Sequence, residues 1–283
     1  MSNLSFGIKT APMHTTYEGI LKVWKEADKN PVFEHAWLFD HFAPIRGSLD
    51  GPCLEAWTLL SALAAETARI RIGVMVTGNT HRHPAILANM AATVDIISNG
   101  RVDFGIGAGW NEYEHTSYNI PLYKTGERIR RLDESCQLMK LLFTQHLTDF
   151  DGRYYTLKEA RCEPKPVQKP YPPFVIGGKG EKLMLRVIAK HADIWNAVGV
   201  TPEEYQHKVH VFHEHCEAVG RDPATVQHSI QQRVMYDNMQ QTAESLQKYI
   251  DAGATHLIFG LSYPYPDDII EKLAEEVIPR VSG

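Results

Sequence analysis

The chain lacks the features that mark several protein classes. Only 4 cysteines occur among its 283 residues, namely Cys53, Cys136, Cys162 and Cys216, and no two of them form a C-x-x-C pair. This spacing indicates neither a zinc ribbon nor a disulfide framework. The first residues also lack the apolar core of a signal peptide. We therefore expect a cytoplasmic protein whose thiols stay reduced.

Charge and hydropathy exclude two further classes of partner. The chain has 29 Lys+Arg and 34 Asp+Glu residues, which give a formal net charge of −5, and the two signs are mixed along the sequence. No basic block would suit nucleic acid or an anionic membrane surface. No apolar run approaches the roughly 20 residues of a membrane-spanning helix. A small molecule is therefore the expected partner, with no nucleic acid and no membrane.

What the sequence does have is a regular alternation of β-rich runs with helical patterns. Eight runs are strand candidates, at 5–11, 35–40, 69–77, 102–109, 173–178, 193–199, 225–236 and 255–261. One of the intervening helical patterns begins at Thr201-Pro202 and ends at Gly220, which are good helix start and stop signals. Near-continuous apolar strands that alternate with helices favour a parallel sheet buried on both faces.

Eight strand–helix units in a chain of this length predict an α/β fold, a (β/α)8 TIM barrel that forms a single domain over residues 1–283. The alternative, an open doubly wound sheet, requires a G-x-G-x-x-G after the first strand, where this chain reads TAPMHTT. Two insertions interrupt the pattern, one after strand four (110–127) and one before strand five (150–173). The second contains DGRYYTL, a candidate hairpin. Loops of this length are usually functional.

In such a barrel the site is built at the carboxyl ends of the strands. The second strand ends in Asp40 and His41. An imidazole titrates near neutrality, which suits a general acid or base, although a histidine bonded to a neighbouring loop is the alternative. Glu112 and Glu114, on the loop after strand four, are candidates for a second acid, and surface charges are the alternative for both. We predict His41 and Glu112 as the catalytic residues.

Two glycine-rich stretches follow strands four and five. The stretch GIGAGW (105–110) removes side chains where a flat ring or a phosphate chain can approach the backbone, and close strand packing is the alternative. The stretch GGKGEK (177–182) opens a helix, whose N-terminus favours an anion, and a plain tight turn is the alternative. The histidines of 202–220 are expected on a solvated outer face, so no metal site is predicted.

Taken together, these residues resemble the luciferase-like oxidoreductase superfamily. The resemblance rests on WLFDHF, on GNTHRHPAILANMAATVDIISNGRVDFGIGAGWNEYEH and on CEPKPVQKPYPPFVIGGKGEKLMLRVIAKHADIWNAVG. It covers nearly the whole chain and is specific for the superfamily. Within it, the chain is similar to the branch that uses the deazaflavin coenzyme F420. Monooxygenases that use flavin mononucleotide (FMN) share the same scaffold.

The resemblance implies a barrel with the deazaflavin ring at its mouth, beside Asp40 and His41. It also implies a non-proline cis peptide behind the ring, at Val74–Met75. The predicted cofactor-binding residues lie at the ends of several strands, and they are Asp40, Val74, Met75, Thr77, Asn79, Gly107, Ala108, Gly109, Gly177, Gly178, Lys179, Gly180 and Trp195.

The implied function is hydride transfer between F420 and a small organic substrate, either an alcohol or carbonyl or an activated double bond. The cofactor supplies the hydride chemistry, and His41 moves the proton. An FMN-dependent monooxygenase that uses reduced flavin and O2 is the alternative enzyme, and a barrel that only binds or stores the cofactor is the non-catalytic one. Relatives are often homodimers, so we expect a homodimer. The sequence names neither the substrate nor the direction of hydride transfer.

Overall fold

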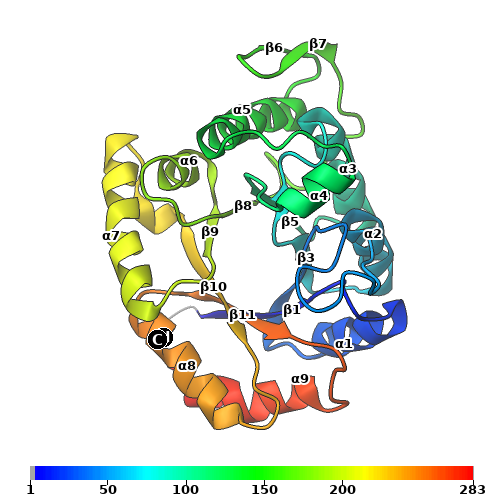
Figure 1. The fold of residues 1–283 in the computed structure, drawn as a ribbon, viewed down its shortest axis with the longest axis vertical. Coiled ribbons are helices and arrows are strands. Elements are labelled where there is room, and N and C mark those ends of the chain that lie inside the picture. Colours follow the sequence, from blue (N-terminus) through cyan, green and yellow to red (C-terminus); the bar gives the residue numbers. More distant parts are fainter. Residues whose placement is uncertain (1–3, 283) are drawn as a thin grey trace.

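A computed structural model describes residues 4–282 as a ring of parallel strands surrounded by helices (Figure 1). The strand order is β3-β2-β1-β11-β10-β9-β8-β5-β4, and an additional pairing of β3 with β5 closes the ring. All pairings in this sheet are parallel. The predicted (β/α)8 barrel is therefore confirmed.

The barrel strands follow the predicted runs closely. They are β1 (Ser5–Thr10), β2 (Phe33–Leu38), β3 (Arg71–Val74), β4 (Thr77–Gly78), β5 (Val102–Gly107), β8 (Phe174–Gly177), β9 (Ile194–Ala197), β10 (Gln227–Arg233) and β11 (His256–Leu261). The third predicted run, 69–77, is split into two strands because Met75 and Val76 leave the ladder. A non-proline cis peptide joins these two residues, one position later than the expected Val74–Met75, so that prediction was wrong by one residue.

Helices cover the outside of the ring. They are α1 (Tyr17–Lys29), α2 (Ala56–Glu66), α3 (Pro84–Ile97), α4 (Glu112–Ser117), α5 (Thr125–Thr144), α6 (Met184–His191), α7 (Pro202–Ala218), α8 (Met239–Asp251) and α9 (Ile269–Lys272). The first insertion forms the short α4, which lies over the strands near β5 in Figure 1. The second contains the antiparallel pair β6 (Thr148–Asp151) and β7 (Thr156–Ala160), so the predicted hairpin is confirmed.

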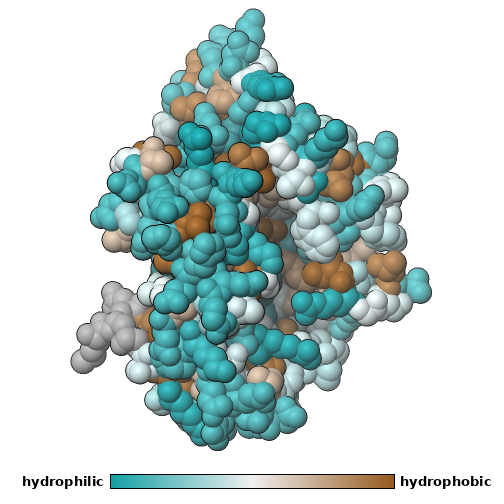
Figure 2. Space-filling view, turned by 60° about the vertical axis from the view of Figure 1, so that its left-hand side comes forward, coloured by the Kyte–Doolittle hydropathy of each residue, from teal (hydrophilic) through white to brown (hydrophobic). Residues whose placement is uncertain are grey.

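The histidine-rich helix α7 lies on the outside of the barrel, as expected. The side chains of His207 and His210 are 60% and 75% exposed. Figure 2, with the α7 side turned forward, shows a mostly hydrophilic surface. Within residues 4–282, no group of three or more His, Cys, Asp or Glu residues is arranged to hold a metal ion. In the same part of the chain, no helix combines the length and apolar character needed to cross a membrane.

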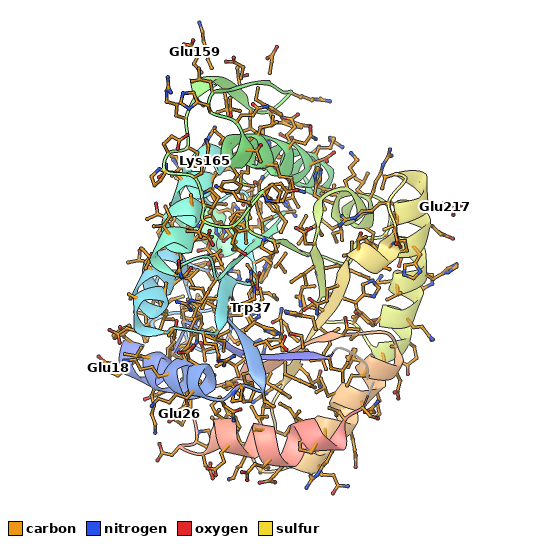
Figure 3. All side chains as sticks on the ribbon, turned by 180° about the vertical axis from the view of Figure 1, so that it is seen from behind. Glu18, Glu26, Trp37, Glu159, Lys165 and Glu217 are labelled. Carbon is orange, nitrogen blue, oxygen red and sulfur yellow. The ribbon has the colours of Figure 1, made fainter. Side chains whose placement is uncertain are left out.

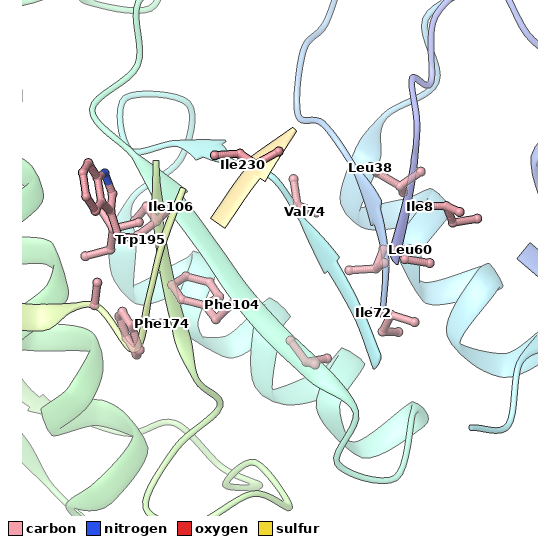
Figure 4. Packing of buried hydrophobic residues seen from close by; sticks show 14 of the residues in the cluster. Ile8, Leu38, Leu60, Ile72, Val74, Phe104, Ile106, Phe174, Trp195 and Ile230 are labelled. Carbon is pink, nitrogen blue, oxygen red and sulfur yellow. The ribbon is translucent and has the colours of Figure 1, made fainter. Parts of the chain in front are cut away.

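The apolar core has an outer and an inner layer because side chains alternate along each strand. Outward-facing residues such as Leu38 and Phe104 pack against the helices, for example on Leu60 of α2 (Figure 4). A smaller cluster fills the barrel interior and comprises Trp37, Met75, Val175, Ile194 and Ile258. Trp37 lies well inside the ring of helices in Figure 3. Burial of both strand faces explains the continuous apolar runs in the sequence.

Ring closure requires a glycine on β5. A Cβ atom at Gly105 would stand 1.8 Å from the carbonyl oxygen of Val74, on the neighbouring segment. We expect Gly105→Ala to destabilise the protein by about 2–3 kcal/mol, because the clashing atom is backbone and cannot rotate away. Urea unfolding measures the change as a lower midpoint. The matched control is Gly126→Ala on α5, where the nearest atom is 3.4 Å away and alanine is the better helix former. Equal midpoints for the two variants would contradict this account.

Candidate active site

A buried carboxylate joins two loops at the carboxyl rim of the barrel. Glu114 of α4 has a side chain that is 0% exposed, and its Oε2 lies 2.8 Å from Nδ1 of His41, after β2. Its Oε1 accepts hydrogen bonds from the backbone N–H groups of Phe42 at 2.5 Å and Ala43 at 3.3 Å. Both oxygens are therefore satisfied, and the loop that carries His41 is bound to the insertion after β5.

The contact between Glu114 and His41 determines which atoms of the two side chains carry a proton. Burial alone raises the pKa of Glu114, but the hydrogen bond and charge of His41 and the two backbone N–H groups outweigh it, so the pKa is lowered. An ionised carboxylate only accepts hydrogen bonds, so Nδ1 of His41 carries a proton. When the ring is neutral, its Nε2 is free to accept a proton. The rings of Phe39 and Trp110 pack edge-on to His41, with centroids 5.0 and 5.6 Å away, and fix its orientation.

Asp40 anchors the same loop from the other side. It is 1% exposed, and its oxygens accept hydrogen bonds from Arg82 at 2.5 and 3.1 Å. Arg82 also binds Glu55 at 2.5 Å. Burial raises the pKa of Asp40, but the nearby His81 and the hydrogen bonds and charge of Arg82 outweigh it, and the pKa is lowered. The carboxylate of Asp40 is engaged by Arg82, and a place for Asp40 beside the cofactor stays a prediction.

The acid beside His41 is Glu114, not Glu112. Glu112 is exposed at the start of α4, and within the described residues its side chain makes no hydrogen bond. Two positions along a helix turn a side chain by roughly 200°, so the two glutamates point in opposite directions. A helix of six residues is too short for its apolar period to reveal the buried face. Sequence reasoning therefore could not choose between them.

Glycines create bare backbone beside this pair. A Cβ at Gly107 would stand 2.8 Å from the side chain of Val76, and one at Gly177 would stand 3.0 Å from it. Gly109 has φ +77°, and a Cβ there would meet Thr80 at 2.3 Å. We call Gly107, Gly109 and Gly177 the glycine floor. These glycines lie at the ends of β5 and β8 and make room for the side chains of Val76 and Thr80, which leaves a surface of small groups that suits a flat ring.

The turn at residues 177–180 lies on the same rim, at the end of β8. It is shaped by hydrogen bonds from the Gly178 N–H to the Asn196 carbonyl at 3.1 Å and from the Trp195 indole to the Gly178 carbonyl at 2.8 Å. Lys179 and Gly180 are exposed, and Lys179 donates to the Gly199 carbonyl at 2.5 Å. No side chain caps α6, whose first N–H groups follow this turn. Such a helix start suits an anion.

Three residues predicted to bind the cofactor have side chains on the helix side of the barrel wall. Val74 belongs to the outer core, and Thr77 accepts a hydrogen bond from Trp57 of α2 at 2.8 Å. Trp195 is wholly buried, with its ring centroid 5.1 Å from that of Phe212 on α7. Strand alternation sends the three side chains outward, so only their backbone atoms face the barrel interior, and their place in the cofactor site stays a prediction. Met75 belongs to the inner cluster, and Ala108 is half-buried at the end of β5.

Asn79 carries an unused acceptor at the rim. It is 2% exposed, and its Nδ2 donates to the Tyr155 hydroxyl at 3.3 Å. Its Oδ1 is buried without a hydrogen-bond partner among the described residues. A buried amide oxygen normally has a partner, so a ligand N–H or O–H group would satisfy it. With the glycine floor and the 177–180 turn, the residues present fit a flat heterocycle that carries a phosphate tail.

Comparison with known proteins gives the family. The family model described as luciferase-like monooxygenase matches residues 4–275. The chain belongs to this luciferase-like family. An uncharacterised protein of Mycobacterium tuberculosis (strain ATCC 25618 / H37Rv) is 31% identical to it over 229 residues, which are 79% of this chain and 76% of the relative.

Two further luciferase-like relatives are named for their cofactor. An F420-dependent glucose-6-phosphate dehydrogenase of Amycolatopsis mediterranei (strain U-32) is 36% identical over 163 residues, 56% of this chain and 46% of that protein. The solved structure of an F420-dependent secondary alcohol dehydrogenase in complex with an F420-acetone adduct is 20% identical, with a TM-score of 0.88 over 99% of this chain and 100% of that one. The structural likeness supports the same barrel fold.

The depressed pKa of Glu114 has a consequence for acid stability. The pKa lies below its ordinary value of 4.5 in the folded state, so ionised Glu114 adds stability above about pH 4.5, and this stability is lost as the pH falls through the folded pKa. We expect the free energy of unfolding to fall less between pH 7 and pH 3.5 in Glu114→Gln than in the wild type. Urea titrations at both values measure it. Glu112→Gln is the exposed control and should keep the wild-type dependence, and an unchanged dependence in Glu114→Gln would refute the assignment.

Proposed function

We propose that this protein transfers a hydride between coenzyme F420 and a small organic substrate, either an alcohol or carbonyl or an activated double bond. The observation that carries the proposal is the pairing of His41 with the buried carboxylate of Glu114 beside the glycine floor. The names of the dehydrogenase relatives support the choice of cofactor. When bound, F420 supplies a ring carbon that accepts or gives the hydride.

The protein would bind the cofactor through residues from several strand ends. The 177–180 turn and the start of α6 would hold the phosphate, because open backbone N–H groups and the helix dipole favour an anion there. The unpaired Oδ1 of Asn79 would accept from the ring or its side chain. The residues that would line the ring are Met75, Val76, Gly107, Ala108 and Gly109.

The remaining chemistry is proton transfer by His41. In alcohol oxidation, Nε2 of His41 takes the hydroxyl proton, and in reduction the protonated ring returns it. The Glu114 carboxylate holds Nδ1 and stabilises the imidazolium that forms. The rings of Phe39 and Trp110 pack edge-on to the imidazole. His41 is thus an oriented acid–base group whose charge is balanced by a buried partner.

Direct titration tests the choice of cofactor. We expect the purified protein to quench the fluorescence of F420 with a Kd at least about tenfold below its Kd for FMN, a difference of about 1.4 kcal/mol. Both ligands are titrated at the same ionic strength. Tighter binding of FMN would overturn the proposal in favour of a flavin-dependent monooxygenase. Binding of F420 with no hydride exchange across a panel of alcohols, ketones and enones would favour a storage barrel.

Substitutions separate chemistry from binding. With the panel substrate that turns over fastest, we expect His41→Ala to lower kcat by about 10²–10⁴-fold, the usual contribution of general acid–base catalysis, while the Kd for F420 changes little. Glu114→Gln should also lower kcat, because the imidazolium loses its counter-charge. Glu112→Gln is the matched control and should stay within about twofold of the wild type. A larger loss in Glu112→Gln than in Glu114→Gln would reverse the assignment of the acid.

Three expectations on organisation stay predictions under this proposal. They are a single domain over residues 1–283, a homodimer and a cytoplasmic location. The match of one family model to residues 4–275 supports the first. Light scattering on the purified protein measures the second.

A further inference from the structure

Lys9 reaches the barrel mouth from inside the sheet. Its neighbours on β1 face outward, since Ile8 belongs to the outer core and Thr10 accepts a hydrogen bond from Trp24 of α1 at 2.8 Å. Alternation therefore sends Lys9 inward. Its Nζ donates to the Met75 carbonyl at 3.1 Å and to Oε1 of Gln231 at 2.6 Å.

Lys9 and His41 are close to the same aromatic ring. The Nζ of Lys9 is 5.9 Å from the centroid of Phe39, and the His41 ring centroid is 5.0 Å from it. Lys9 as a whole is half-buried. A ligand that extends from His41 past the Phe39 ring would therefore meet a second polar group, one that the proposed proton transfer does not use.

A chain of neutral side chains holds Lys9 in this position. Gln231 donates through Nε2 to Asn196 at 2.8 Å, and Asn196 donates to Ser229 at 2.9 Å. Ser229 in turn contacts Nδ1 of His256 at 2.8 Å. Because the amide N of Gln231 is engaged by Asn196, its oxygen faces Lys9. Gln231 is thus a positioning residue that presents an acceptor but no charge.

The positive charge at this point is not balanced by the protein. An ammonium has three donors, and two of them are used on the neutral oxygens of Met75 and Gln231. Within residues 4–282, neither Lys9 nor the nearby Arg46 side chain forms an ion pair with a carboxylate. Burial and the Arg46 charge lower the pKa of Lys9 to about 7. A bound anion would complete both its hydrogen bonding and its charge balance.

We propose that Lys9 binds an anionic oxygen of the molecules that meet at the barrel mouth. This inference rests on the proposed function, because it places a ligand beside His41. Two sources share the chemistry: a carboxylate on the substrate, and the pyrimidine end of the reduced deazaflavin, which carries negative charge. The protein therefore acts on anionic substrates, or uses Lys9 to stabilise the reduced cofactor.

Carboxylate probes test the first source. Benzoate and its neutral isostere benzamide are titrated against the protein, with and without oxidised F420, by tryptophan fluorescence. We expect benzoate to bind more tightly than benzamide, and Lys9→Met to weaken benzoate by at least about tenfold, the loss typical of one hydrogen bond to a charged group. Lys9→Arg should retain binding, and Gln231→Glu should weaken it, because a built-in carboxylate competes. Lys29→Met, an exposed lysine at the end of α1, is the control and should match the wild type.

The pH dependence of benzoate binding identifies the group responsible. The charged groups that face Lys9 are Arg46 and, across Phe39, His41. We expect wild-type affinity to fall as the pH rises from 6 to 9, because Lys9 loses its proton over this range. Lys9→Arg should be flat, since a guanidinium stays charged. A fall that persists in Lys9→Arg would assign the effect to His41 and overturn the proposal.

The second source is tested with the cofactor itself. The Kd values of oxidised and reduced F420 are measured for the wild type and Lys9→Met, under anaerobic conditions. A loss of affinity for reduced F420 alone assigns the anion to the ring, a loss for benzoate alone assigns it to the substrate, and losses of both support both sources. No loss for either overturns the inference. If the wild type binds F420 in neither state, the proposed function fails, and benzoate binding without cofactor still reports on Lys9.

Discussion

The buried carboxylate of Glu114 is the interaction on which the site depends. It accepts hydrogen bonds from one side chain and two backbone groups of the loop after β2. A buried charge is stable only when it is paired and fully hydrogen-bonded, so these contacts hold the loop and α4 in one arrangement. The Asp40–Arg82 pair does the same one residue earlier. His41 thus stands between two satisfied buried carboxylates, one that anchors its backbone and one that orients its ring.

Closure of the parallel ring makes this arrangement possible. Every barrel strand ends at the same rim. Residues distant in sequence, such as Lys9, His41 and Gly177, therefore lie together there because of the strand arrangement alone. Glycines at the ends of β5 and β8 leave room for the side chain of Val76. The barrel interior is apolar around Trp37 and polar along the chain from His256 to Lys9. The polar chain fixes the position of a charge at the mouth.

The sequence predicts the fold well because alternation of strands and helices is a local signal. It also predicts the location of Asp40, His41 and the glycine stretches, since the carboxyl end of each strand can be read directly. It does not predict which face of a strand points inward, because a one-residue change of register reverses every side chain. For this reason it does not show that the side chains of Val74, Thr77 and Trp195 face the helices. Lys9 lies within an apolar strand, and a charge at that position marks an inward-facing polar site.

Contacts between residues far apart in the chain are the second feature of the site that the sequence does not predict. Glu114 and His41 are 73 positions apart, and only the packed structure shows that they meet. The choice between Glu112 and Glu114 depends on how a single helical turn is set on the barrel. Both residues are glutamates on the same short segment, so no sequence pattern distinguishes them.

The most direct test of the account is a crystal structure of the protein with F420 bound. The account predicts the ring against Val76 and the glycine floor, within reach of Nε2 of His41, and the phosphate at the 177–180 turn. A ring at another edge of the barrel, or a phosphate too far from that turn for one cofactor to span both, would contradict it.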